Sequence, residues 1–266
     1  MSFIEVSNVD LAYRGNSQDR RDEGTLALAG IELAIEEGSF VSVVGPSGCG
    51  KSTLLRLLSG LMLPSRGTVR VDGRQVDAPL KTVGIAFQNS TLLPWRNVRD
   101  NVLLPLEIVA PHRARFRKTK SVYVGRTEQL LATVGLDGFG DRMPWQLSGG
   151  MQQRAQLCRA LIHEPAILLL DEPFAALDPF TREELWGVLQ RLFNDRRCTV
   201  ILVTHELLEA VFLSDTVHIM SAPPGRVIAS RSIAFTRPRL LEMSYCSDFV
   251  DLVQELRSHV GNARTA

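Results

Sequence analysis

Two stretches near the N-terminus alternate apolar and polar side chains. Residues 3–13 and 26–35 follow this period of two, which is typical of antiparallel strands with one exposed face. Later runs are apolar throughout and predict buried strands, such as those of a parallel sheet: 39–44, 83–87, 166–170 and 199–203. Further strand patterns lie at 68–73, before an Asp-Gly turn, and in a closing hairpin of 216–220 and 225–228.

Helical periodicity dominates the middle of the chain. Between Leu92 and about Arg159, apolar residues recur at intervals of three and four, most clearly at 98–109 and 126–134. We interpret this segment as a helical subdomain inserted into an α/β core. Other helices are expected at 53–58, 148–161, 181–193 and 248–260. The polar, charged segment 14–24 predicts a loop.

Composition and charge exclude several classes of protein. With 266 residues, 45% of them hydrophobic, the chain can bury a sizeable core. Its 30 basic and 29 acidic side chains give a net charge of +1, so no global field attracts nucleic acid or anionic lipid. The stretch 112–120 does contain five Lys or Arg residues. A solvated helix face or loop explains it more simply than contact with lipid headgroups or nucleic acid.

The sequence also bears on where the protein resides. No apolar run approaches the roughly eighteen residues that span a bilayer, and Glu5 interrupts the N-terminus before a signal-peptide core could form. The four cysteines are far apart and follow no metal-binding spacing, which favours reduced thiols that mostly fill the core. We therefore expect a soluble protein of the cytoplasm.

A glycine-rich motif follows the apolar run at 39–44. The sequence Gly45-Pro46-Ser47-Gly48-Cys49-Gly50-Lys51-Ser52 fits the pattern G-x-x-x-x-G-K-[ST]. In this pattern, glycines let backbone N–H groups surround phosphate oxygens, the lysine supplies a positive charge and the hydroxyl ligates Mg²⁺. The helix that continues from Thr53 would place the positive end of its dipole at the anion. The motif predicts a nucleotide phosphate site.

Polar residues stand at the ends of three other buried strands. They are Gln88, the pair Asp171 and Glu172, and His205. Ligands bind at the carboxyl ends of strands in open α/β sheets. There, one carboxylate can hold Mg²⁺ while the other polarises a water molecule, and the amide can reach either. Gln88 as a turn residue and His205 as a structural histidine are the simpler alternatives.

A second helix start is also suited to an anion. Ser148 is a natural N-cap, and Gly149 and Gly150 leave backbone N–H groups uncovered. An ordinary capped helix would explain this segment by itself. Two anion sites in one chain nevertheless invite a common explanation.

Taken together, the motifs resemble the nucleotide-binding subunit of an ATP-binding cassette (ABC) transporter. The resemblance covers about residues 3–260 and is carried by Gly45–Ser52, Leu147–Met151 and Leu168–Pro173, with Gln88 and His205 at fitting intervals. It implies an α/β P-loop NTPase (RecA-like) core with an antiparallel β subdomain and an inserted helical subdomain. The single ATP-binding domain, 1–266, would comprise a catalytic core at 1–90 and 163–230, a helical subdomain at 91–162 and a C-terminal helical extension at 231–266.

The resemblance also implies roles for individual residues. Tyr13 would stack on adenine, and the loop Gly45, Pro46, Ser47, Gly48, Cys49, Gly50, Lys51, Ser52 and Thr53 would bind the phosphates of ATP. The ligands of Mg²⁺ would be Ser52, Gln88 and Asp171. Glu172 would be the general base, and His205 would contact the γ-phosphate as a switch.

Two copies of the chain are implied as well. Ser148, Gly149 and Gly150 would close on the γ-phosphate held by a second copy, with Asp178 at the dimer seam, so that two copies enclose two ATP molecules. The sequence departs from the family pattern at Met151, where glutamine is usual, and at Ala176, where serine is common. Both departures bear on how strongly the dimer closes.

A finer resemblance indicates transport. The segments 92–98 and 223–227 resemble importers for nitrate, sulfonates, taurine or related small organic ions. Trp95 and Arg96 could contact a membrane subunit, although Trp95 could instead pack within the subdomain. We expect an ATP-hydrolysing importer subunit, peripheral on the cytoplasmic face of the cell membrane. It would work as a homodimer beneath two transmembrane permease subunits that receive solute from a periplasmic or extracellular binding protein.

A soluble ABC-type ATPase that acts on nucleic acid or ribosomes is the alternative function. The balanced charge and the lack of an aromatic and basic stripe for single strands argue against it.

Overall fold

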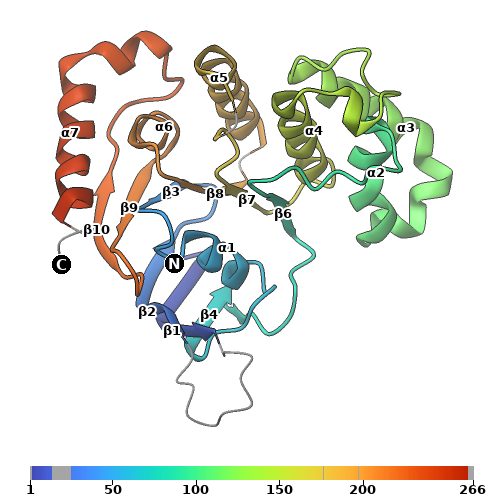
Figure 1. Ribbon diagram of the computed structural model, residues 1–266. Coiled ribbons are helices and arrows are strands. Elements are labelled where there is room, and N and C mark those ends of the chain that lie inside the picture. The colour runs from blue at the N-terminus through green and yellow to red at the C-terminus, as the bar shows by residue number, and fades with distance from the viewer. Residues whose placement is uncertain (1, 14–24, 176, 197, 263–266) are drawn as a thin grey trace. The chain divides into compact units, whose positions relative to one another are not determined.

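The computed structural model describes residues 2–13, 25–175, 177–196 and 198–262 of the chain (Figure 1). The loop expected at 14–24 and the departure at Ala176 lie outside these residues. The chain divides into two compact units. Unit 1 comprises residues 1–80 and 199–266, and unit 2 comprises residues 81–198.

Unit 1 begins with an antiparallel sheet of strand order β2-β1-β4-β5. Its strands are β1 (Ile4–Tyr13), β2 (Thr25–Ile35), β4 (Arg66–Val71) and β5 (Arg74–Gln75). In β1, Ile4 pairs with Ile35 on one side and with Val71 on the other. Buried and exposed residues alternate at the start of β1 and along most of β2, which confirms the strands expected from the period of two.

A second group of strands in unit 1 has the order β10-β9-β3-β8. These strands are β3 (Phe40–Val44), β8 (Thr199–Thr204), β9 (Thr216–Met220) and β10 (Val227–Ser232). β3 lies between β8 and β9 and is parallel to both, whereas β10 is antiparallel to β9. Every residue of β3 and β8 is buried, as their continuous apolar runs predicted.

Three helices complete unit 1. They are α1 (Lys51–Leu58), α6 (Leu207–Leu213) and α7 (Ser247–Asn262), and a 3₁₀ turn at Leu241–Tyr245 precedes α7. α7 packs against α6 and β9 (Figure 1). The C-terminal helix therefore belongs to the same compact unit as the phosphate loop.

Unit 2 combines two parallel strands with the helical segment. The strands are β6 (Val83–Ala86) and β7 (Ile167–Asp171), paired so that Ala86 lies opposite Leu170. The helices are α2 (Val98–Ile108), α3 (His112–Thr133), α4 (Gly149–Leu161) and α5 (Pro179–Arg196), with a 3₁₀ turn at Pro144–Gln146. α4 packs against β6, α2 and α3 (Figure 1).

Two helices differ from the expectation. α3 begins at His112, so the basic stretch 112–120 is helical and continuous with the helix predicted from 126, with a kink at Thr119. The five Lys and Arg side chains of this stretch are exposed. The short helix α6 was not predicted, because nearly all its residues are buried and it shows no polar face. Within the described residues, no helix is both long and apolar enough to cross a membrane.

His218 on β9 makes the stability of unit 1 depend on pH. Its side chain is buried, with Nδ1 2.7 Å from the hydroxyl of Ser230, and burial lowers its pKa to about 4. As the pH falls below about 6.5, His218 becomes protonated in the unfolded chain but stays neutral in the folded protein. The free energy of unfolding therefore decreases until the pH reaches about 4. Lowering the pH from 7.5 to 5 should reduce the free energy of unfolding of the parent protein by about 2 kcal/mol more than that of His218→Gln. Urea unfolding at both pH values measures this difference, and equal losses would contradict it.

Candidate functional site

The glycine-rich loop in unit 1 joins β3 to α1. Gly48 and Gly50 adopt left-handed φ angles of 78° and 94°, which side chains disfavour. A Cβ on Gly50 would lie 2.5 Å from Cδ2 of Leu28, and one on Gly45 would lie 2.8 Å from Sγ of Cys49. Behind the loop, a Cβ on Gly225 would lie 2.0 Å from the carbonyl oxygen of Cys49. Close packing therefore favours glycine at Gly45, Gly50 and Gly225, whereas at Gly48, where a Cβ would meet no atom within 4 Å, the φ angle alone favours it.

Lys51 lies across this loop. Its ammonium group donates to the carbonyl oxygens of Gly45, at 2.9 Å, and Pro46, at 3.1 Å, and the residue is 5% exposed. Ser52 and Thr53 follow in the first turn of α1, near the positive end of the helix dipole. A positive side chain, a helix N-terminus and closely spaced backbone groups together make a site suited to phosphate oxygens.

Tyr13 reaches the same helix from the end of β1. Its hydroxyl lies 2.8 Å from Oγ1 of Thr53 and 3.8 Å from Sδ of Met62. The residue is 39% exposed. Unit 1 therefore brings Tyr13 beside the helix that begins at the phosphate loop, and stacking on adenine remains a prediction.

His205 follows β8 at the edge where β3 ends. The parallel register pairs Val44 with Thr204, so Gly45 and His205 are the next residues on neighbouring strands. His205 is about half exposed, with Nε2 3.9 Å from a carboxylate oxygen of Glu206. A cavity of about 380 Å³ is lined by residues of the loop, of α6 and of α7: among them Gly45, Ser47, His205, Leu208 and Arg257. The histidine and the loop thus share one cavity.

The two predicted carboxylates lie at the end of β7 in unit 2. Asp171 is buried and ends the strand, and Glu172 follows with a left-handed φ of 45°. A positive φ is uncommon for a non-glycine residue and is found often at functional sites. Nε2 of Gln88, beyond the end of β6, lies 3.5 Å from Oε2 of Glu172. Unit 2 therefore brings Gln88 and Glu172 together, and their roles towards Mg²⁺ and water remain predictions.

Two glutamines of α4, not singled out in the sequence, fix the backbone before and at Gln88. Nε2 of Gln153 donates to the carbonyl oxygen of Gln88, and Nε2 of Gln156 donates to that of Phe87. Both glutamines are buried. Their burial is visible only in the structure, where each amide nitrogen donates to a backbone carbonyl, since buried polar groups need partners.

The second predicted anion site lies at the start of α4, also in unit 2. Ser148 caps the helix by accepting a hydrogen bond from the Met151 N–H at 3.3 Å. A Cβ on Gly149 would meet no atom within 4 Å, so this backbone is open. A cavity of about 560 Å³ is lined by both helix glycines and by a nearby loop and helix: Ser148, Gly149, Gly150, Met151, Leu177, Asp178 and Thr181 among others.

Asp178 contributes a negative charge to that cavity. Its Oδ1 accepts a hydrogen bond from the Thr181 N–H at 3.1 Å. Hydrogen bonds from the side chain and backbone of Thr181 lower the pKa of this carboxyl. Asp178 therefore stays ionised at neutral pH, and contact with a second copy remains a prediction.

The donor set predicted for magnesium has suitable chemistry. Ser52 offers a hydroxyl oxygen, Gln88 an amide oxygen and Asp171 a carboxylate, and hard cations prefer such oxygen ligands. In the described part of the chain, no cluster of three His, Cys, Asp or Glu could hold a metal by itself. Magnesium is usually held by one or two carboxylates together with substrate phosphates, and its binding here remains a prediction.

Sequence comparisons point to one protein family. The profile of a protein family described as ABC transporter matches residues 28–175. The chain is 43% identical to the bicarbonate transport ATP-binding protein of Synechococcus elongatus, over 89% of this chain and 82% of that protein. It is 42% identical to the taurine import ATP-binding protein of Escherichia coli, over 80% of this chain and 81% of that protein.

Solved structures are similar across nearly the whole chain. A dimeric ATP-binding cassette in a post-hydrolysis state with ADP and Pi matches with a TM-score of 0.73 and 30% identity, over 88% of this chain and all of that chain. A part of the cbiONQ ABC transporter complex of Clostridium perfringens matches with a TM-score of 0.72 and 26% identity, over 96% and 95% of the two chains.

Proposed function

The chain belongs to the ABC transporter family, and we propose that it is the ATP-hydrolysing subunit of an importer for a small solute. The P-loop NTPase fold with an antiparallel β subdomain and a helical segment, expected from the sequence, is confirmed by the similar cassettes. The observation that carries the proposal is the tightly packed phosphate loop with Lys51 across it.

In the proposed reaction, water attacks the γ-phosphate of ATP and yields ADP and phosphate. Lys51 and the N–H groups of the loop bind and orient the phosphates, and Tyr13 contacts adenine. Glu172 accepts the proton of the attacking water, while Gln88 and His205 orient the water and the γ-phosphate. When bound by Ser52, Gln88 and Asp171, Mg²⁺ would neutralise charge on the phosphate oxygens.

The second anion site supports a homodimer. Ser148, Gly149 and Gly150 would approach the ATP of a second copy, and the open space at Gly149 supports this approach. Asp178 would lie at the seam between the copies. Met151 in place of glutamine would leave this cavity with one polar side chain fewer. One relative in structure is a dimeric cassette that holds the products ADP and Pi.

Transport requires partners that this chain does not supply. We propose that the dimer binds two transmembrane permease subunits at the cytoplasmic face of the membrane, with solute delivered by a separate binding protein. Relatives named for bicarbonate transport and taurine import favour a small, charged solute of the nitrate, sulfonate or taurine kind. Selection of that solute would reside in the partner proteins.

Trp95 is the side chain best suited to contact a permease. It is 71% exposed, whereas Arg96 already pairs with Glu107 at 2.9 Å. Exposed aromatic side chains of this size are enriched at protein interfaces. Trp95→Ala should weaken association with the permease by about tenfold or more without changing nucleotide affinity.

Co-purification with the membrane subunits from the native host measures this association. Trp145→Ala is the matched control, because Trp145 is 65% exposed in the same unit and is expected to have no such role. Unchanged recovery of the permease with Trp95→Ala would contradict the contact. Co-purification of RNA without membrane subunits would instead favour the alternative function on nucleic acid or ribosomes.

A further inference from the structure

Helix α6 follows His205 closely in the chain. The buried strand β8 ends at Thr204 and holds the chain before His205, and α6 begins two residues after it. Oγ1 of Thr204 accepts a hydrogen bond from the Glu206 N–H at 3.0 Å and is also bonded to the Glu209 carboxylate. The start of α6 is thus held by hydrogen bonds to Thr204 of β8, and its C-terminal end must be held by other contacts.

That far end needs an external partner. α6 has seven residues, and so short a helix is unstable by itself. The last carbonyl groups of a helix accept no hydrogen bond from an N–H group of the same helix, so they need donors from elsewhere. In α6 and its C-cap, these carbonyls belong to Val211, Phe212, Leu213 and Ser214.

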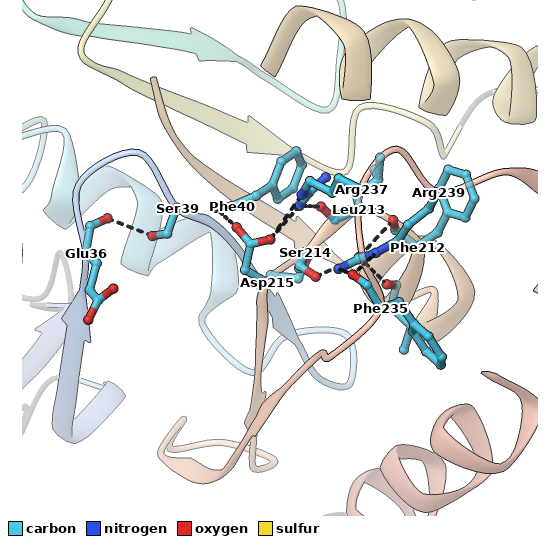
Figure 2. A network of polar contacts seen from close by, with 12 residues as sticks. Glu36, Ser39, Phe40, Phe212, Leu213, Ser214, Asp215, Phe235, Arg237 and Arg239 are labelled. Atoms are coloured by element: carbon cyan, nitrogen blue, oxygen red, sulfur yellow. Dashed lines mark hydrogen bonds and ion pairs between the residues drawn. The ribbon is translucent and has the colours of Figure 1, made fainter. Parts of the chain in front are cut away.

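Arg239 supplies most of these donors. Its Nη1 donates to the carbonyl oxygens of Phe212 and Ser214, at 3.0 and 2.8 Å (Figure 2). The same nitrogen donates to the carbonyl oxygen of Val211 at 2.8 Å. Its other nitrogens donate to the carbonyl oxygen of Phe235, at 3.1 and 3.0 Å. The residue is 3% exposed. A buried cation at the C-terminal end of a helix is favoured by the helix dipole.

Phe235 links this cap to the C-terminal helix. Its ring stacks on that of Phe249 in α7, with centroids 5.5 Å apart. α7 in turn lines the cavity beside His205 with Arg257 and Val260. The segment that carries Arg239 therefore contacts both the C-terminal end of α6 and helix α7.

Arg237 completes the network and connects it to β3. It donates to the Leu213 carbonyl oxygen and to Oδ1 of Asp215, the latter at 2.9 Å (Figure 2). Oδ2 of Asp215 accepts from the N–H of Phe40, the first residue of β3, at 2.8 Å. The guanidinium of Arg237 lies over the ring of Phe40, 5.6 Å from its centroid. β3 leads directly into the phosphate loop.

Arg239 remains charged in this environment at neutral pH. Burial, together with the positive charge of Arg237, lowers the pKa of Arg239 to about 10, and Asp215 opposes this shift. The cap is therefore present throughout the physiological pH range.

We propose that Arg239 is a positioning residue that acts through α6 to hold His205 at the edge of the phosphate loop. This inference rests on the proposed function, in which His205 contacts the γ-phosphate. Because α6 is short and bonded to β8 at its start, a shift at its capped end is transmitted to its first turn. Loss of the cap should therefore misplace His205 while the phosphate loop, built by β3 and α1, still binds ATP.

The test compares Arg239→Lys with the parent protein. Lysine keeps the charge but cannot reach four carbonyls at once, and it leaves fewer carbonyls unpaired than Arg239→Met, which could prevent folding. We expect kcat for ATP hydrolysis to fall by about ten- to a hundredfold, with KM for ATP within about twofold, as a displaced reacting group predicts. Hydrogen exchange should accelerate at the amides of residues 205–213. Arg231→Lys, an exposed arginine of the same unit that pairs with Glu255, is the control and should change neither quantity.

A second background separates positioning from general destabilisation. In His205→Ala, Arg239→Lys should cause no further loss of kcat, because the group that it positions is absent. An equal loss in both backgrounds, or unchanged exchange at 205–213, would overturn the inference. Hydrolysis by His205→Ala at the parent rate would instead remove the proposed role of His205, and the exchange measurement would still decide whether Arg239 fixes α6.

Discussion

Replacing Glu172 by glutamine should lower the rate of ATP hydrolysis by about 10²–10⁴-fold, the usual contribution of a general base. The change removes the proton acceptor and keeps the shape of the side chain. Binding of ATP should persist, because Lys51 and the phosphate loop are assigned to the phosphates, whereas Glu172 is assigned to the attacking water. The variant should therefore accumulate as an ATP-bound dimer, which light scattering and a phosphate-release assay would detect.

Glu164→Gln provides a matched control for this variant. Glu164 lies in the same unit, has a similar left-handed φ of 53° and pairs through an exposed side chain with Arg126. The Glu164→Gln variant should hydrolyse ATP at the parent rate. If Glu172→Gln also did so, another group would have to accept the proton.

Replacing Lys51 by alanine should reduce the affinity for ATP by about 10- to 150-fold, as expected for loss of a charge-assisted hydrogen bond to phosphate. The buried ammonium group donates hydrogen bonds to the carbonyl oxygens of Gly45 and Pro46. Titration calorimetry with ATP would measure the change, and circular dichroism would show whether the fold is kept. Arg56→Ala, an exposed cation on the same helix, should bind ATP as the parent does. Equal affinity of Lys51→Ala and parent would exclude Lys51 from the phosphate site.

Much of the fold could be predicted from the sequence, because an element with a buried face carries apolar residues on that face at a regular spacing. β1, β2, β3 and β8 begin and end within one residue of their apolar patterns. The first half of α3 could not be predicted in this way, because its residues are exposed on most sides and have no apolar period. α6 has the opposite problem, since burial on nearly all sides also removes the period.

The candidate site shows the same contrast. The glycines of the phosphate loop are constrained by close backbone contacts, so the sequence itself carries the motif. Arg237 and Arg239 were missed because most of their partners are backbone carbonyls, which no pattern of side chains reveals. Their function depends on a strand and a helix that lie more than twenty residues earlier in the chain.

The packing behind the phosphate loop has a thermodynamic consequence. Gly225 exchanges hydrogen bonds with the β2 backbone, donating to Ala27 O at 2.9 Å and accepting from Ala29 N at 3.0 Å, while it presses against Cys49. The receptor for the triphosphate is thus shaped during folding, and little conformational entropy is lost when the ligand arrives. After each turnover the emptied loop retains its form and is ready for the next molecule without a refolding step.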